Sequence, residues 1–430
     1  MESSDEDQGE KNKPQVQIFT VPFTLGEIKE NINININTPS KPSKEQIINQ
    51  AFKFHSQGNI SEAAKYYQYC INQAFKDYRV FTNYGVILKK FGKLQEAEKF
   101  QREAIQINPN FAEAYSNLGN ILRDLGQLKE AELSFRKAIE IKSDYAEAYS
   151  NLGNILRDLG QLKEAELSFR KAIEIKPDYA EAHSNLGNIL SDLGIKKEAK
   201  LEKQKSIDIN FIQNINSKYR EDCKRKISLS KSQFRQDLFA LTELGFKKNG
   251  FFVEFGSYDG LTGSNSYLLE KFFNWDGILA EPMISCHEKL KNNRSVRIET
   301  KCVWKSSGQE ILFNEPFSYK QMATIDSFSE EKPDYYKEGK RYIVKSISLL
   351  DLLDINNAPK FIDYLSIDTE GSEYDILNAF DFEKYKFRVI TCEHNFTPMR
   401  EKIYNLLINN GYKRKLTNLS RVDDWYIYES

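Results

Sequence analysis

The sequence predicts a multidomain chain, in which an all-α solenoid is followed by an α/β domain. A period of 34 residues runs from residue 44 to about residue 208, which is typical of stacked helical repeats. From about Ser228 onward, short β-rich runs alternate with helix-like stretches, the pattern of a mainly parallel sheet covered by helices on both faces. The length of 430 residues agrees, since domains usually contain about 100–200 residues.

The composition excludes several classes of protein. The 61 Lys and Arg residues balance the 62 Asp and Glu residues, whereas a protein that coats nucleic acid or an anionic membrane surface needs a surplus of cations. No apolar run approaches the ~20 residues of a membrane-spanning helix, and the acidic start at 1–7 is unlike a secretory or transit peptide. The five cysteines form no CxxC pair, so neither a disulfide framework nor a zinc knuckle is expected. These features predict a cytoplasmic protein.

Residues 1–43 are expected to form a flexible acidic arm. Ile and Asn alternate over 31–37, a pattern that one edge strand would also produce, and Pro and Ser give a linker over 38–43. A mobile arm is the simpler interpretation of the whole segment.

The repeats begin at residue 44. Ala112–Lys142 recurs letter for letter as Ala146–Lys176, and further copies begin at Lys44, Tyr78 and Ala180. Each copy predicts two amphipathic helices, in which small residues allow close approach and large apolar residues fill the space between the helices. A glycine at the same place in each copy ends the first helix.

The spacing of the repeats resembles the tetratricopeptide repeat, with about five copies in register. A charged, helix-compatible segment after Lys200 is expected to cap the last copy, so the predicted solenoid covers 44–226. The resemblance implies stacked copies around a groove for a protein or peptide partner. Asparagines in register on the first helices are the candidate partner-binding residues: Asn117, Asn120, Asn151, Asn154, Asn185 and Asn188. Their SNLGN wording resembles the repeats of peptide-binding glycosyltransferases, and solvated amides on a helix face would give the same pattern.

The predicted α/β domain covers 227–430. Its expected strands are Phe251–Phe255, Gly277–Glu281, Val296–Trp304, Phe361–Asp368, Phe387–Glu393, Tyr412–Leu416 and Asp424–Tyr428. Its expected helices are Ser264–Phe273, Met283–Lys291, Ser348–Leu353, Ser372–Phe380 and Pro398–Asn409. Only a polar turn separates the last two strands, so one of them is expected to run antiparallel.

The first strand leads into a glycine-containing turn, Glu254–Gly260. A doubly wound sheet binds nucleotide-like ligands at such a junction, and Gly256 lets the backbone approach the ligand. The spacing is not GxGxxG, so no dinucleotide pyrophosphate is implied. The carboxylates of Glu254 and Asp259 suit a cationic ligand without phosphate, such as S-adenosylmethionine. A purely structural turn would show the same residues.

Carboxylates also stand at the ends of later strands. Glu281 follows about 20 residues after the turn, where it can accept hydrogen bonds from both ribose hydroxyls. Asp368 and Glu370 follow a central strand, and Glu393 and His394 end the next one. Together these groups can deprotonate a hydroxyl nucleophile, or alternatively they can ligate a hard divalent cation.

These motifs together resemble the FkbM-type methyltransferase family over about residues 230–430. The stretches that carry the resemblance are Ser232–Asp237, Gly250–Gly263, Ser264–Glu270, Gly277–Pro282, Ser346–Leu353 and Asp363–Leu377. The resemblance implies a Rossmann-like class I methyltransferase fold and an S-adenosylmethionine-dependent O-methyltransferase, often acting on hydroxyls of glycans or natural products.

The resemblance also implies roles for individual residues. The cofactor-binding residues are expected to be Glu254, Gly256, Ser257, Asp259, Gly260, Ser264, Asn265, Glu281, Cys302 and Asp368. The catalytic residues are expected to be Asp368, Glu370 and His394, with Glu370 and His394 as candidate bases. No metal ligand is assigned.

Three functions fit these features. The leading one is an active methyltransferase that acts on a hydroxyl of a glycan or related metabolite, with repeats that dock a partner or present the acceptor. The alternative is a repeat scaffold for protein binding with a catalytically idle methyltransferase fold. The third is another Rossmann-like enzyme, such as a nicotinamide oxidoreductase, which the absence of GxGxxG disfavours.

Overall fold

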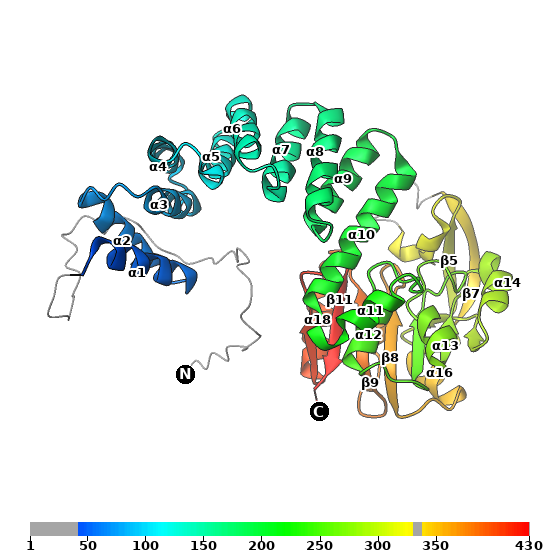
Figure 1. Ribbon diagram of the computed structural model, residues 1–430. Helices are drawn as coiled ribbons and strands as arrows, with labels where there is room; N and C mark the ends of the chain where they lie inside the picture. Colours follow the sequence, from blue (N-terminus) through cyan, green and yellow to red (C-terminus); the bar gives the residue numbers. More distant parts are fainter. Residues whose placement is uncertain (1–41, 330–337, 430) are drawn as a thin grey trace. The chain divides into compact units, whose positions relative to one another are not determined.

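The computed structural model describes residues 42–329 and 338–429 (Figure 1). Nearly all of the predicted arm, including the Ile/Asn alternation at 31–37, lies outside the described residues. The chain divides into two compact units, the first ending at Lys203 and the second beginning at Gln204. Among the described residues, no helix has both the length and the apolar character that crossing a bilayer requires.

The first unit is built from helices that pack in successive pairs, as Figure 1 shows for α3 to α8. The helices are α1 (Lys44–Ser56), α2 (Ile60–Asn72), α3 (Tyr78–Lys90), α4 (Leu94–Ile107), α5 (Ala112–Asp124), α6 (Leu128–Ile141), α7 (Ala146–Asp158), α8 (Leu162–Ile175), α9 (Ala180–Asp192) and the first part of α10 (Lys196–Asn214). Their bounds follow the period of the sequence, so the predicted all-α repeats are confirmed.

Packing within a pair depends on a glycine that faces a phenylalanine. A Cβ added to Gly119 of α5 would lie 2.8 Å from the ring of Phe135 of α6, which is fully buried. Gly153 and Phe169 repeat this contact at the same distance. The glycine therefore lets the two helices approach until the ring fills the space between them.

Arginines join successive pairs at the surface. Arg102, Arg136 and Arg170 each pair with a glutamate 28 residues later, at 3.1, 2.9 and 2.7 Å. Each of them also pairs with a glutamate four residues earlier on its own helix. The arginine side chains are 39–48% exposed, so each of these ion pairs is expected to add little stability.

The second unit contains a seven-stranded sheet in the order β10-β11-β9-β8-β1-β2-β3. Its strands are β1 (Phe251–Phe255), β2 (Asp276–Ala280), β3 (Arg297–Glu299), β8 (Phe361–Ile367), β9 (Lys386–Glu393), β10 (Tyr412–Lys415) and β11 (Asp423–Tyr428). The central strand β1 is parallel to both neighbours, with Val253 opposite Ile278 and Leu365. Only β11 opposes its neighbours, β9 and β10, so the predicted antiparallel strand is present. This mixed α/β sheet is consistent with the predicted methyltransferase fold.

A second, four-stranded sheet was not predicted. Its order is β4-β7-β5-β6, from β4 (Cys302–Trp304), β5 (Glu310–Pro316), β6 (Thr324–Ile325) and β7 (Gly339–Ser348). The run Val296–Trp304, expected as one strand, is therefore β3 and β4, which lie in different sheets. The chain leaves the first sheet after Glu299 and joins the second at Cys302, which pairs with Ser346.

Helices cover both faces of the seven-stranded sheet. They are α11 (Arg220–Lys226), α12 (Gln236–Glu243), α13 (Tyr267–Phe273), α14 (His287–Asn293), α16 (Leu349–Ile355), α17 (Glu373–Asn378) and α18 (Met399–Asn409), with short 3-10 turns at Ser217–Tyr219, Ile284–Cys286, Lys320–Met322 and Asp326–Phe328. Phe211, Ile215 and Cys223 belong to the same apolar core as Phe239 and Trp425. The segment 204–226, expected to close the repeats, thus packs within the second unit, because its apolar side chains bury there.

Candidate active site

A pocket opens at the carboxyl ends of β1, β2 and β8, beside the second sheet. We call it the strand-end pocket. Its lining is Phe255, Gly256, Tyr258, Ala280, Glu281, Pro282, Met283, Cys302, Val303, Phe313, Lys320, Gln321, Ala323, Ile325, Asp368, Thr369 and Ser372. Ligands of open α/β sheets bind at this edge.

Four of the expected site residues line the strand-end pocket: Gly256, Glu281, Cys302 and Asp368. The others do not line it: Glu254, Ser257, Asp259, Gly260, Ser264, Asn265, Glu370 and His394. The lining that sequence reasoning missed includes Tyr258, Lys320 and the apolar side chains of the second sheet. Tyr258 lies inside the predicted turn Glu254–Gly260, and this position could have indicated that it lines the pocket.

Gly256 brings the ends of two strands together. It has φ +70°, and a Cβ there would lie 1.8 Å from the carbonyl oxygen of Asp368. Its N–H donates to the carbonyl of Ala280 at 3.2 Å. A residue with a side chain fits neither the backbone conformation nor the space, so glycine is required at this point of the pocket.

Glu281 presents a fixed carboxylate to the strand-end pocket. Its two oxygens accept hydrogen bonds from the backbone N–H groups of Tyr258 at 2.7 Å and Met283 at 2.9 Å. Burial raises the pKa of Glu281 to about 7, with further raising by Glu315 and Glu254, although the two N–H donors oppose the shift. Each oxygen keeps a lone pair, so the group can still accept hydrogen bonds from hydroxyls of a ligand.

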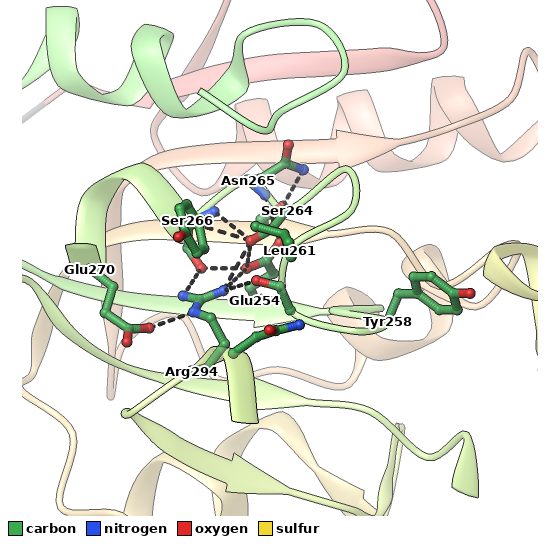
Figure 2. A network of polar contacts seen from close by, with 12 residues as sticks. Glu254, Tyr258, Leu261, Ser264, Asn265, Ser266, Glu270 and Arg294 are labelled. Atoms are coloured by element: carbon green, nitrogen blue, oxygen red, sulfur yellow. Dashed lines mark hydrogen bonds and ion pairs between the residues drawn. The ribbon is translucent and has the colours of Figure 1, made fainter. Parts of the chain in front are cut away.

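Glu254 is held by internal partners instead of facing the pocket. Its carboxylate accepts hydrogen bonds from the N–H of Asn265 at 2.7 Å and from the hydroxyls of Ser264, at 3.2 Å, and Ser266. Figure 2 shows this network around Arg294, with Tyr258 pointing away from it. These hydrogen bonds therefore hold the loop at Ser264–Ser266 against strand β1.

Arg294 supplies the positive charge of this network. Its side chain is fully buried and ion-pairs with Glu270 and, at 3.7 Å, with Glu254. It also donates to the hydroxyls of Ser264 and Ser266 at 3.0 and 2.8 Å. Two buried carboxylates thus share one buried guanidinium, an arrangement that is costly to disrupt.

The remaining turn residues also have internal roles. Asp259 accepts hydrogen bonds from the N–H groups of Leu261 and Thr262 at 3.0 and 2.7 Å, which stabilises the turn. The side-chain amide of Asn265 donates to the hydroxyl of Ser366 at 2.9 Å. The carbonyl of Ser257 accepts from the N–H of Gly260 at 2.8 Å. These contacts shape the loop that carries Tyr258 into the pocket.

Three carboxylates meet at the ends of β8 and β9. Asp368, Glu370 and Glu393 each offer one oxygen, and these oxygens lie within 4.8 Å of one another. We call these three residues the acidic cluster. Asp368 is accessible from the strand-end pocket, whereas Glu370 and Glu393 are buried. The cluster therefore reaches the pocket through one member.

The acidic cluster is electrostatically unfavourable as it stands. The protein atoms around Asp368 raise the pKa of its carboxyl well above the usual value although the residue opens onto the pocket, and Glu370, Asp423 and Glu373 raise it further. Burial likewise raises the pKa of Glu393, with contributions from Asp368 and Glu370. A carboxyl with a raised pKa at a pocket wall is suited to accept a proton near neutral pH.

Some of the residues with positive φ lie at the same edge of the sheet. Tyr258, Glu370, Asn395 and Phe396 have φ values of +46°, +61°, +44° and +56°. Non-glycine residues in this region cost free energy, and they concentrate at functional sites. The four residues follow β1, β8 and β9, the strands that bound the strand-end pocket and the acidic cluster.

His394 is fixed by the backbone on both sides of its ring. The N–H of Phe396 donates to Nδ1 at 2.9 Å, so the proton is on Nε2, which donates to the carbonyl of Asp423 at 3.0 Å. Burial lowers the pKa of His394, and Asp424 opposes that shift. Both nitrogens are occupied, so the expected role as base is not favoured by the geometry.

The predicted asparagines of the repeats are partly exposed, and Asn188 is exposed. Asn117 also lines a hollow of the first unit, together with Asn83. The other lining residues are Phe52, Arg79, Thr82, Phe111, Glu113 and Tyr145. Part of the amide row therefore faces a concave surface with aromatic and charged side chains.

The chain combines a helical repeat array with a mixed α/β domain that has a pocket at its strand ends. Domains of this second kind are common among enzymes that bind nucleotide-like ligands. Residues 254–414 match the family model of the methyltransferase FkbM domain. Tetratricopeptide repeat models match 78–111, 100–132, 119–156 and 153–194. The chain therefore carries tetratricopeptide repeats followed by an FkbM methyltransferase domain, which confirms the resemblance predicted from its motifs.

Comparison with curated proteins found no match. Among solved structures, the repeats are similar to MamA, at 21% identity over 38% of this chain and 95% of that chain, with a TM-score of 0.35. YrrB, described as a TPR protein with an unusual peptide-binding site, is 23% identical over 39% of this chain and 86% of that one, with a TM-score of 0.34. A thermophilic TPR protein of Thermus thermophilus is 18% identical over 39% of this chain and 91% of that one, with a TM-score of 0.34.

Proposed function

We propose that the second unit is an S-adenosylmethionine-dependent O-methyltransferase that acts on a hydroxyl of a glycan or related metabolite. The observation that carries the proposal is Glu281, a buried carboxylate in the wall of the strand-end pocket, held by two backbone N–H groups. The match of 254–414 to the methyltransferase FkbM domain supports the reaction class.

The lining of the strand-end pocket fits this cofactor in chemistry. Glu281 would accept hydrogen bonds from the ribose hydroxyls, and Gly256 leaves room for close approach of the backbone. Met283, Val303 and other apolar side chains would contact the adenine ring. The carboxylates suit the positive charges of the cofactor, which, when bound, supplies an electrophilic methyl group. Glu254 supports the loop and would act on the cofactor only through it.

In this proposal the acceptor hydroxyl would bind beside Asp368. Of the expected catalytic residues, Asp368 is the one that lines the strand-end pocket. Its raised pKa suits acceptance of a proton from a hydroxyl, which typically contributes about 10²–10⁴-fold to the rate. Glu370 lies behind it and raises the pKa of Asp368. Glu370 therefore acts through Asp368 rather than on the acceptor.

The repeats would dock a protein or peptide partner, or present the acceptor to the second unit. Asn117 and Asn83 line the hollow of the first unit and offer amides to an extended chain. We place the protein in the cytoplasm, because its five cysteines are free and buried.

A methyl-transfer screen tests the proposal. The full chain is incubated with labelled S-adenosylmethionine and panels of sugars, glycolipids and peptides, and transfer to a hydroxyl is expected. Asp368→Asn should lose turnover by a larger factor than it weakens cofactor binding. Cofactor binding without transfer to any acceptor would favour the idle scaffold, and displacement of the cofactor by a nicotinamide dinucleotide would favour an oxidoreductase.

A further inference from the structure

The acidic cluster has the composition of a cation site. Asp368 follows β8, Glu370 lies two residues further on, and Glu393 ends the neighbouring strand β9. One oxygen from each residue lies within 4.8 Å of the other two. Three carboxylates from two adjacent strand ends therefore face one small volume.

A second observation points to a ligand at this place. The side chain of Glu393 is 8% exposed, and within the described residues its Oε2 is buried and has no hydrogen-bond partner. A buried carboxylate oxygen without a donor is costly, and such groups in folded proteins usually have a partner. Internal packing of the cluster therefore leaves a strong acceptor unused.

The carboxyl groups of Asp368 and Glu393 share a side-chain hydrogen bond, but within the described residues no cationic neighbour of the cluster bonds Oε2 of Glu393. The groups that act most strongly on Asp368 and Glu393 are Glu373, Asp423 and the other members of the cluster, and all of them are acidic. The sum of these charges favours a bound cation over a hydroxyl or amide donor, because attraction between opposite charges is strong where water is excluded.

We propose that Asp368, Glu370 and Glu393 bind a hard divalent cation, such as Ca²⁺, Mn²⁺ or Mg²⁺. Oxygen-only ligand sets select these ions over softer metals. Ligands on opposite sides of Ca²⁺ lie about 4.6–5.2 Å apart, so oxygens within 4.8 Å of one another are close enough to share that ion. Mg²⁺, with opposite oxygens about 4.0–4.2 Å apart, requires a small contraction.

The surroundings provide support and access. The side-chain amide of Asn395 donates to Oε2 of Glu370 at 3.4 Å, in the way that outer-shell groups orient ligating carboxylates. Asp368 opens onto the strand-end pocket, which gives the ion a route of entry and leaves coordination positions for water or a ligand hydroxyl. The site goes beyond the proposed methyl transfer, since a cation would bind there without cofactor or acceptor.

Binding of Mn²⁺ to the full chain tests the proposal without any turnover. Electron paramagnetic resonance counts free Mn²⁺ during a titration, and Mg²⁺ or Ca²⁺ competes in a second titration. One site per chain is expected. Asp368→Asn and Glu393→Gln should each weaken binding by at least about tenfold, since loss of outer-shell partners alone costs about 10–100-fold. Glu383→Gln, at a side chain that is 90% exposed, is the matched control and should bind as the original chain does.

Thermal unfolding of the same proteins separates loss of the site from loss of the fold. Asp368→Asn and Glu393→Gln should raise the midpoint without metal, because each removes a charge from a repulsive cluster, and should abolish the rise that Ca²⁺ produces in the original chain. Saturable binding that survives both substitutions, or no binding of any of the three ions, would overturn the proposal.

Discussion

Gly256, directly after β1, lies so close to Asp368, directly after β8, that a Cβ on the glycine would be 1.8 Å from the carbonyl oxygen of the aspartate. This contact joins the loop that carries Tyr258 to the strand that carries the acidic cluster. The geometry of the strand-end pocket therefore depends on one residue that has no side chain.

Gly256→Ala should destabilise the second unit and abolish ligand binding in the strand-end pocket. The change adds a clash to the cost of a positive φ, together more than about 3 kcal/mol. Gly263→Ala is the control, since Gly263 has φ +74° and open space around its Cβ position. It should cost only about 1–2 kcal/mol. Urea unfolding measures both, and equal losses would show that the contact with Asp368 is unimportant.

Arg294→Met should cost about 3–5 kcal/mol, because it leaves Glu254 buried without a cation and Glu270 paired only with Lys271. Arg297→Met, three residues later in β3, is the matched control. Its exposed ion pair with Asp276 is worth less than about 1 kcal/mol. Denaturant titration of the two variants should separate them clearly. Similar stabilities would mean that the network around Glu254 is relaxed in solution.

Glu281 should make stability depend on pH. Its pKa is about 7 in the folded protein against an ordinary 4.5, so the folded state holds an extra proton between these values. Stability should fall as pH rises through that window, by up to about 1.4 kcal/mol per pH unit for each such group. Glu315 and Glu254 are the charged neighbours that raise this pKa and thereby widen the pH window.

Glu281→Gln should flatten this slope, since glutamine takes up no proton. Asp237 and Asp423, whose pKa values burial also raises to about 7, keep part of the slope in the variant. Urea unfolding at a series of pH values gives the comparison. If the free energy of unfolding depended on pH equally in the two proteins, Glu281 would not contribute to the pH dependence.

The repeats should depend on their buried rings far more than on their surface ion pairs. Phe135→Ala removes a fully buried ring from its contact with Gly119 and should cost about 3–5 kcal/mol. Arg136→Ala, one residue later, should cost less than about 1 kcal/mol despite its pairs with Glu132 and Glu164. Helical circular dichroism during heating measures both, and equal costs would contradict the packing described here.

The repeats could be predicted from sequence because the residues that pack together recur at the same positions in successive copies. Gly119 and Phe135 recur as Gly153 and Phe169, so the period itself reveals which residues meet. The second sheet has no such redundancy. In its strand β7, Ile343 and Val344 are both apolar although only Val344 is buried, so the sequence does not show the period of two that burial has there.

The site could be predicted only in part, because a strand-end carboxylate looks the same whatever its partner is. Glu281 faces the strand-end pocket, whereas Glu254 forms an ion pair with Arg294. Arg294 lies 40 residues later, and no local sequence pattern predicts that the two residues meet. His394 stands at the expected strand end, yet the backbone of Phe396 and Asp423 occupies its ring. Such pairings depend on tertiary contacts, which spacing along the chain does not encode.

Calorimetric titration of the full chain with S-adenosylmethionine measures whether the strand-end pocket binds this cofactor through Glu281. Above the raised pKa, at about pH 8, one molecule should bind per chain. Glu281→Ala should weaken binding by about 10²-fold or more, since two hydrogen bonds to a charged group are worth about 3 kcal/mol or more. Asp276→Asn, at the opposite end of the same strand β2, should bind normally. Absence of binding to the original chain, or equal affinity in Glu281→Ala, would contradict the account.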